Sequence, residues 1–332
     1  MTSAPTIRTT PDIDGEAWGR LRNGDPFATI FHAPGWLSAL TTAWPYYRLE
    51  WLVAERGNEL AGAMPVVVAR RYGVDQRLSL PYGAPGTPLA VDDDVRRALL
   101  AAWWEAAKSP RVVRAHVTFH LPPGGATFPD WPGAAATQPE STHLLDLAPG
   151  FDHIWTEVFD GGIRRSCARS EREGLVVIAG TDAVAVADLD RLYREQAAEW
   201  TNHTRFPESF LPAVVANLPD HALVFRAMAD GRAVAAQLVL FDDRTAWSFI
   251  TPNSPEGRER RAPTLLYRHA IEMMAGRGLR WYHFGGSRGH RPLEEFKASL
   301  GGRPHADAEC LVEAAWFRPL HRLQYRLRGI TE

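Results

Sequence analysis

Residues 222–240 read ALVFRAMADGRAVAAQLVL, and this stretch decides the fold class. Two apolar, strand-like arms flank the turn-forming residues Ala-Asp-Gly-Arg, which is the pattern of a β-hairpin. Residues 48–68, RLEWLVAERGNELAGAMPVVV, repeat the arrangement in the first half of the chain, with a glycine again in the turn. We therefore predict a hairpin in each half.

The segments that follow the two hairpins also correspond. A third strand pattern comes next, at residues 77–82 in the first half and 245–250 in the second. Helical patterns follow at residues 95–108 and 264–275. The order strand, turn, strand, strand, helix, strand thus occurs twice, which indicates an internal repeat of one α/β unit.

A Pro/Gly-rich stretch at residues 121–140 separates the halves and reads as a linker. We place the boundary near residue 148 and predict two domains, 1–148 and 149–332. The expected class is α/β, with a mixed, mostly antiparallel sheet flanked by helices in each domain.

The amino-acid composition excludes several classes of protein. Of 332 residues, 45% are hydrophobic and 23% charged, which suffices for a sizeable core. The net charge of −2 excludes global attraction to nucleic acid, so a polyanion would need a local basic patch. The two cysteines, Cys167 and Cys310, form no CxxC pair, which argues against a disulfide framework or a zinc site. No apolar run approaches the roughly 20 residues of a membrane span, and no signal peptide is evident, so we expect a cytoplasmic protein.

Two segments carry a family resemblance. Residues 164–174, RRSCARSEREG, form an Arg-rich helical pattern that closes in glycine. Residues 282–287, YHFGGS, are followed by Phe296-Lys297 ahead of a Gly pair. The chain resembles the Fem family of aminoacyl transferases and the BioF2-like acetyltransferases of the GNAT superfamily. Trp36 and the loop around Tyr82 are similar to that family as well.

The resemblance implies tandem GNAT-like domains and a reaction. Fem-like enzymes transfer an aminoacyl group from aminoacyl-tRNA to an amine, typically on a cell-wall precursor, and form an amide bond. The resemblance assigns a catalytic role to Lys297 and places Phe296 beside it. It implies no further cofactor, since the charged tRNA is the co-substrate. The coiled-coil insertion of larger Fem proteins is missing, so the acceptor amine stays open, as does the oligomeric state.

Lys297 also stands out by composition, because only two of the 37 basic residues are lysines, Lys108 and Lys297. Amide formation passes through an oxyanion, and a compact ammonium is suited to stabilise it. The alternative is a surface ion pair with Glu294, three residues earlier. Phe296 either lines the acyl site or belongs to the core.

Several arginines are candidates for binding phosphate oxygens, which a guanidinium holds bidentately. Helical spacing places three of them on one face, and two more precede a predicted helix N-terminus; these are Arg165, Arg169, Arg172, Arg258 and Arg261. The alternatives are a solvated, salt-bridged helix face and an ordinary basic loop.

Residues 256–263, EGRERRAP, bear on the identity of the acyl donor. They occupy the position of the pyrophosphate-binding loop in acetyl-CoA-dependent GNAT enzymes. No second glycine is in register, which disfavours acyl-CoA. A thioester donor, acyl-CoA or acyl carrier protein, is the first alternative to aminoacyl-tRNA. A non-catalytic binding module is the second.

Weaker candidates complete the site. His283 is either a base or a structural strand histidine. Ser287 and Arg288 follow its strand, where a loop faces substrate in our interpretation, and Tyr82 shapes the acceptor cleft. His116 and His120 lack a third ligand, so we predict no metal site.

Overall fold

The computed structural model describes residues 4–71, 73–124, 130–199, 205–287 and 289–317. The chain divides into two compact units, one of Met1–Glu140 with Ala306–Glu332 and one of Ser141–His305. The predicted division at residue 148 differs from this. The last strand of the chain returns to the first sheet, and a division made in sequence order takes no account of such a return.

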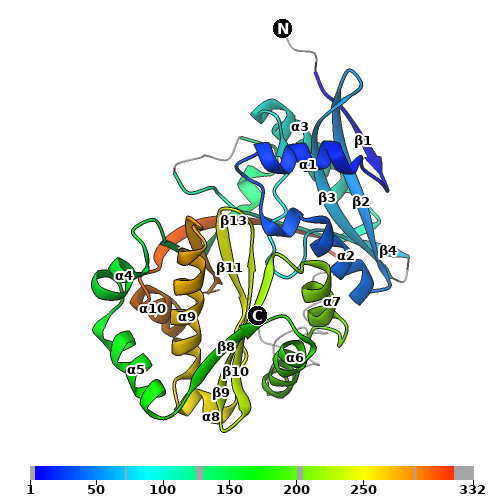
Figure 1. The fold of residues 1–332 in the computed structure, drawn as a ribbon. Helices are drawn as coiled ribbons and strands as arrows, with labels where there is room; N and C mark the ends of the chain where they lie inside the picture. Colours follow the sequence, from blue (N-terminus) through cyan, green and yellow to red (C-terminus); the bar gives the residue numbers. More distant parts are fainter. Residues whose placement is uncertain (1–3, 72, 125–129, 200–204, 288, 318–332) are drawn as a thin grey trace. The chain divides into compact units, whose positions relative to one another are not determined.

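The first unit is a mixed sheet with helices on both faces (Figure 1). Its strands run β1-β2-β3-β4-β6-β13 across the sheet. All neighbours are antiparallel except β4 and β6, which are parallel. The strands are β1 (Thr6–Thr10), β2 (Tyr47–Arg56), β3 (Glu59–Arg71), β4 (Val74–Ser79), β5 (Leu89–Ala90), β6 (Val112–Phe119) and β13 (Arg303–Glu313). The helices are α1 (Gly15–Gly24), α2 (Pro34–Ala43) and α3 (Asp93–Ala107), with 3-10 turns η1 (Ile30–His32) and η2 (Ala134–Ala136).

Alternation along the strands separates two cores in this unit. On one face of β2, Leu52 and Ala54 pack with Trp103 of helix α3 in a buried cluster. On the other face, Trp51 contacts Trp18 of helix α1, with ring centroids 4.9 Å apart. Asp92 is the N-cap of helix α3, and its carboxylate accepts from the backbone N–H of Val95 in the first turn.

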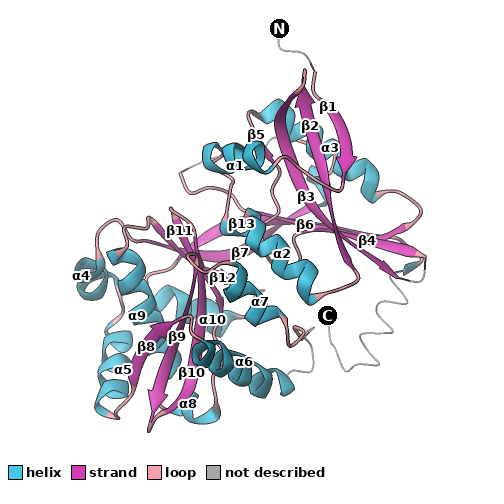
Figure 2. Cartoon of the chain, turned by 45° about the vertical axis from the view of Figure 1, so that its right-hand side comes forward, coloured by secondary structure: helices cyan, strands magenta, loops and turns pink. Residues whose placement is uncertain are grey.

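The second unit repeats the plan (Figure 2). Its sheet runs β7-β12-β11-β10-β9-β8, with β11 and β12 parallel. The strands are β7 (Thr137–Asp146), β8 (Val176–Gly180), β9 (Ala222–Ala229), β10 (Arg232–Phe241), β11 (Thr245–Ile250) and β12 (Trp281–Gly286). The helices are α4 (Phe151–His153), α5 (Gly161–Arg172), α6 (Ala183–Ala198), α7 (Phe210–Asn217), α8 (Pro255–Glu259), α9 (Ala262–Gly276) and α10 (Arg291–Ser299), with a π-helical turn at η3 (Ile154–Val158).

Helices α5, α9 and α10 cover one face of this sheet, and α6 and α7 cover the other (Figure 1). The α9 face holds a buried apolar cluster that includes Leu266 and Ile271 of the helix with Tyr282 and Phe284 of β12. The predicted order of strands and helix is confirmed in both units, as β2-β3-β4-α3-β6 and β9-β10-β11-α9-β12. The predicted linker ends earlier than expected, because strand β7 already begins at Thr137.

Candidate active site

Strands β11 and β12 separate at the centre of the second unit. They pair in parallel from Thr245 opposite Trp281 to Trp247 opposite His283, where the described pairing ends. Beyond this point β12 pairs with β7 through a bulge between His283 and Gly286. A bulge bends a strand and redirects its backbone groups. Gly285 adopts a φ of 75°, which glycine reaches without steric cost.

The redirected carbonyls of this bulge hold Lys297. Its Nζ donates to the Gly285 carbonyl at 2.6 Å, to the Gly286 carbonyl at 3.0 Å and to the Ser287 Oγ at 2.9 Å. The residue is 2% exposed, so the surface ion pair with Glu294 is not the arrangement found. A buried ammonium requires such acceptors, because an unsatisfied charge in the interior is costly. The amine is therefore fixed at the end of strand β12.

The Gly pair after Lys297 fixes the helix that carries it. Helix α10 ends at Ser299 with Leu300 as its C-cap, and the Gly302 N–H donates to the Lys297 carbonyl at 3.0 Å. A Cβ at Gly302 would approach that carbonyl oxygen to 2.8 Å and the Phe284 ring to 3.0 Å. Only glycine fits so close a contact. The spacing of Phe296, Lys297 and the glycines thus has a packing reason.

Ser287 is buried beside this ammonium. Its Oγ accepts from Lys297, and its N–H donates to the Ser141 carbonyl at 3.2 Å. A hydroxyl has one proton to donate besides its lone pairs, and here that proton has no acceptor among the described residues. A donor polarised by a cation is suited to a developing oxyanion. Arg288 lies outside the described residues.

His283 and Phe296 have structural contacts. The His283 ring stacks on Trp247 with centroids 3.9 Å apart, and its Nδ1 accepts from the Gly285 N–H at 3.0 Å. This hydrogen bond occupies one of the two nitrogens that a base would use, and supports the bulge. Phe296 packs against the core and contacts Tyr267 edge-on at 5.6 Å.

A buried polar network lies on the α9 face where the two strands separate. The Gln237 Nε2 donates to Ser248 Oγ at 2.9 Å and to Tyr282 Oη at 3.1 Å. Ser248 continues to Tyr267 Oη at 3.1 Å. Gln237 is completely buried, yet its Oε1 has no hydrogen-bond partner among the described residues. Burial raises the pKa of Tyr282 well above its usual range, so this phenol stays protonated.

Sequence reasoning also missed His143 on strand β7. Its side chain is 3% exposed, and the Nδ1 atom is enclosed without a hydrogen-bond partner among the described residues. Residues 141–147 read as a short strand in the sequence, which was the available signal. A lone strand histidine without a motif gave no reason to select it.

The predicted arginine ridge lies on the exposed surface of helix α5. Arg165, Arg169 and Arg172 are all exposed. Arg169 pairs with Glu173 at 2.6 Å, as a solvated helix face predicts. The exposure of all three arginines agrees with the helical spacing that predicted a shared face. Phosphate binding at this face stays a prediction.

The turn from β11 to α9 differs from a phosphate-cradling loop. Its backbone N–H groups donate within the turn itself, to local carbonyls and to Ser254 Oγ; they belong to Gly257, Arg258, Arg260, Arg261 and Thr264. Pro263 has no N–H to offer. The exposed Arg258 lies 3.6 Å from Glu199, and Arg261 begins α9 with a φ of 56°. Anion binding here would depend on arginine side chains.

Trp36 and Tyr82 belong to the first unit. Trp36 is completely buried in helix α2 and contacts Phe31 edge-on at 5.0 Å. Tyr82, with a φ of 69°, stacks on Trp44 at 4.7 Å, and its hydroxyl lies 3.0 Å from that of Tyr47. Both are packing residues in these contacts, and their roles in substrate binding stay predictions.

The two histidines weighed as metal ligands have carboxylate partners on strand β13. His116 Nε2 lies 3.2 Å from Glu309, and His120 Nδ1 lies 3.0 Å from the buried Asp307. Asp307 also accepts from the Leu121 N–H at 3.3 Å. These contacts attach the returning strand to the first sheet.

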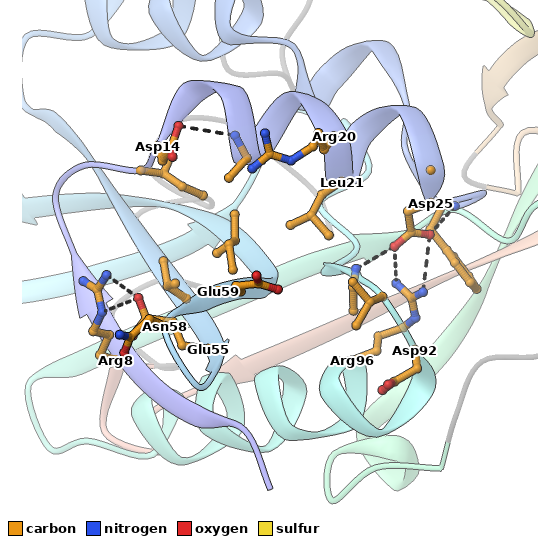
Figure 3. A pocket seen from close by; sticks show the side chains of 18 of the residues that line it. Arg8, Asp14, Arg20, Leu21, Asp25, Glu55, Asn58, Glu59, Asp92 and Arg96 are labelled. Atoms are coloured by element: carbon orange, nitrogen blue, oxygen red, sulfur yellow. Dashed lines mark hydrogen bonds and ion pairs between the residues drawn. The ribbon is translucent and has the colours of Figure 1, made fainter. Parts of the chain in front are cut away.

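The first unit also contains a hollow of about 1110 Å³ between α1 and the β2–β3 turn (Figure 3). Much of its charge is paired internally. Arg8 donates to Glu55 at 2.7 Å, and Arg96 donates to the buried Asp25 at 3.0 Å. Asp25 further accepts from the Ala90 N–H at 2.6 Å, which fixes the loop before α3. This hollow is built from structural ion pairs.

Comparison with known proteins identifies the fold. Residues 160–298 match the family model described as an acetyltransferase (GNAT) domain. The chain is similar to the crystal structure of FemX, with a TM-score of 0.67 and 11% identity, over 95% of this chain and 99% of that one. It is similar to the C-terminal (DUF2156) domain of a putative lysylphosphatidylglycerol synthetase from Agrobacterium fabrum, with a TM-score of 0.57 and 14% identity over 93% of each chain.

A third similar structure is a tandem GNAT protein from the clavulanic acid biosynthesis pathway, with a TM-score of 0.56 and 17% identity, over 93% of this chain and 98% of that one. A search of curated sequences gave no match. The chain therefore has a tandem GNAT fold, as predicted. None of its described helices combines the length and apolar character that a bilayer crossing requires.

Proposed function

We propose that this chain is a Fem-like N-acyltransferase that moves an aminoacyl group from aminoacyl-tRNA to an acceptor amine. The observation that carries the proposal is the buried ammonium of Lys297, held against the bulge carbonyls and Ser287 where β11 and β12 separate. An acyl transfer forms an oxyanion, and a fixed cation with a polarised donor stabilises that charge.

Three acceptors of Lys297 lie among the described residues, and they suggest its role. An ammonium has three protons, and Gly285, Gly286 and Ser287 accept them. We assign the direct hydrogen bond to the Ser287 hydroxyl, whose proton has no acceptor in the part of the chain that the structure describes and can be donated to the oxyanion. Lys297 supplies the positive charge and orients that hydroxyl. The amine nitrogen bonds to the carbonyl carbon, the ester C–O bond breaks, and the ribose hydroxyl leaves.

The turn before α9 supports tRNA as the donor. Its N–H groups are used locally, so the turn offers few backbone donors for the pyrophosphate of coenzyme A. The exposed arginines of α5 suit the phosphates of a tRNA acceptor end. A thioester donor is the second candidate, favoured by the match of residues 160–298 to a GNAT acetyltransferase domain.

One assay tests both donors. A tRNA pool charged with ¹⁴C-labelled amino acids is incubated with the protein and a panel of primary amines, including diamines, amino sugars and amino acid amides. Mild alkali then hydrolyses remaining esters, and chromatography measures alkali-stable amide. Product that disappears after RNase treatment supports the tRNA donor. Product from ¹⁴C-acetyl-CoA alone supports the thioester, and product from neither contradicts an acyltransferase function.

A further inference from the structure

His143 is a buried polar side chain without a hydrogen-bond partner in the described part of the chain. Its ring is 3% exposed, its Nδ1 is enclosed, and neither ring nitrogen bonds to a residue that the structure describes. An unsatisfied buried polar group costs about 1–3 kcal/mol, so an apolar residue would serve packing better here. Such a group calls for an explanation, and a catalytic role is one.

The strand register places His143 opposite the bulge. On the neighbouring strand pair, Leu144 lies opposite His283, and Thr142 lies opposite Gly286. His143 sits between these pairs, so it faces the bulged segment whose carbonyls hold the ammonium of Lys297.

Alternation along β7 places the imidazole on the same face as that ammonium. Leu145, two residues further on, belongs to the buried cluster that includes Leu300 at the end of helix α10. Side chains two residues apart in a strand share a face. His143 therefore points toward the α10 side of the sheet, where Lys297 lies.

Burial, together with the charge of Lys297, favours the neutral form of His143 near pH 7. Burial, and then the ammonium of Lys297, lower the pKa of its imidazole below the usual range, while Glu294 acts in the opposite direction. Both charged groups belong to α10. A neutral imidazole has a lone pair ready to accept a proton.

We propose that His143 is the general base of the amide-forming reaction, an inference that rests on the proposed acyl transfer. As the C–N bond forms, the attacking amine passes one proton to Nε2, the ring nitrogen that is not enclosed. The imidazolium then returns that proton to the departing ribose oxygen as the C–O bond breaks. The histidine ends neutral, and no other reactant is needed.

The neighbouring groups are less suited to this task. The Lys297 ammonium holds its protons in three hydrogen bonds. The Nδ1 of His283 is occupied by the Gly285 N–H, and its ring stacks on Trp247. Cation and base thus act together, since Lys297 stabilises the oxyanion while His143 takes the proton.

The test compares His143→Phe and His143→Gln with the unaltered protein, using the donor and amine that give product in the assay above. His269→Phe is the matched control, because His269 is a half-buried histidine on α9 without a place in the mechanism. Each variant is first checked for its melting temperature and circular dichroism spectrum. The readout is kcat/KM from pH 5 to 9.

The unaltered protein should lose activity below pH 6.5 with a slope of one, as His143 takes up a proton. Both His143 variants should be slower by about 10²- to 10⁴-fold at pH 7.5, and their kcat/KM should lack the decrease at low pH. His269→Phe should match the unaltered profile. His143 variants within threefold of the unaltered protein at every pH would overturn the base assignment. Absence of amide product from the unaltered protein would instead contradict the proposed function.

A second measurement stays informative if the variants do not fold. In ¹⁵N-histidine NMR of the unaltered protein, the His143 imidazole should titrate below pH 6.5 and shift upward in pKa in Lys297→Gln. The signals of His32 and His269, whose pKa values burial lowers to about 4, should not shift in that variant. A His143 signal that ignores the Lys297 substitution contradicts the juxtaposition on which the inference depends.

Discussion

Each unit contains a pair of parallel strands, β4 with β6 and β11 with β12. The two units differ in what occupies the space beyond the end of this pairing. In the first unit, β4 and β6 pair as far as Ser79 opposite Val117. The chain then folds back, and the Gly86 N–H donates to the Thr118 carbonyl at 2.8 Å. Ser79 Oγ donates to the Gly86 carbonyl at 2.7 Å. The first unit thus fills its strand separation with its own backbone.

In the second unit the corresponding region contains polar groups instead. Carbonyls of the bulge turn to Lys297, and the completely buried Gln237 keeps an Oε1 without a partner among the described residues. Under the proposed mechanism, a duplicated fold needs only one reactive centre. The first unit satisfies the backbone groups of this region internally, while the second keeps polar groups that we propose for substrate binding.

The largest expected effect is on Lys297. Lys297→Ala should lower kcat by about a hundredfold or more, because the charge that orients Ser287 is lost. The control is Lys108→Ala, since Lys108 is exposed in the first unit and pairs with Glu105 at 2.5 Å. Transfer rates measured on folded protein distinguish the two. Near-normal turnover in Lys297→Ala would contradict the proposal that the second unit contains the reactive centre.

The next largest effect is on the free energy of unfolding of the first unit. A Cβ at Gly86 would lie 2.2 Å from Ser79 Oγ and 2.3 Å from its carbonyl oxygen, so Gly86→Ala should destabilise by about 1–3 kcal/mol. Gly19→Ala, where nothing lies within 4 Å of the added carbon, should be neutral or stabilise by up to about 1 kcal/mol. Urea unfolding measures both. Equal urea midpoints for the two variants would mean that the loop at Gly86 is not tightly packed against Ser79.

Activity per folded molecule should be unchanged in Gly86→Ala, because the first unit contains no reacting group in this scheme. A hundredfold loss in a folded Gly86→Ala protein would assign chemistry to the first unit and contradict the comparison.

The smallest effect is on donor binding. Arg165→Ala, on the exposed face of α5, should weaken charged tRNA binding modestly and reduce the salt slope by about one. Arg20→Ala removes the same charge from the first unit, where Arg20 pairs with Glu16. Fluorescence titrations at several salt concentrations measure both slopes. Identical slopes would remove the α5 surface from the donor site.

Local patterns in the sequence predict most of the fold. The turn at Asp230 and Gly231, with φ values of 49° and 79°, requires the residues that favour a tight hairpin. Periodic apolar positions predict α9 and the strands beside it. These signals are local, which explains why both copies of the repeat are readable without a structure.

The site is only partly predictable, because several of its key contacts are made by backbone carbonyls. Lys297 stands out in the sequence, but backbone carbonyls hold its ammonium, and no residue type marks a carbonyl as an acceptor. The position of His143 opposite the bulge depends on strand register, which a single sequence does not specify. Trp36, predicted as a site residue, is completely buried in helix α2, and its role in substrate binding stays a prediction.

The return of β13 to the first sheet has a consequence for synthesis on the ribosome. Residues Ala308–Glu313 complete the edge of β6, yet they emerge after the entire second unit. During translation, β6 therefore waits with unpaired backbone groups while residues 141–305 acquire their structure. The unit made first is finished last, and a nascent chain stalled before residue 306 should expose an open, aggregation-prone edge.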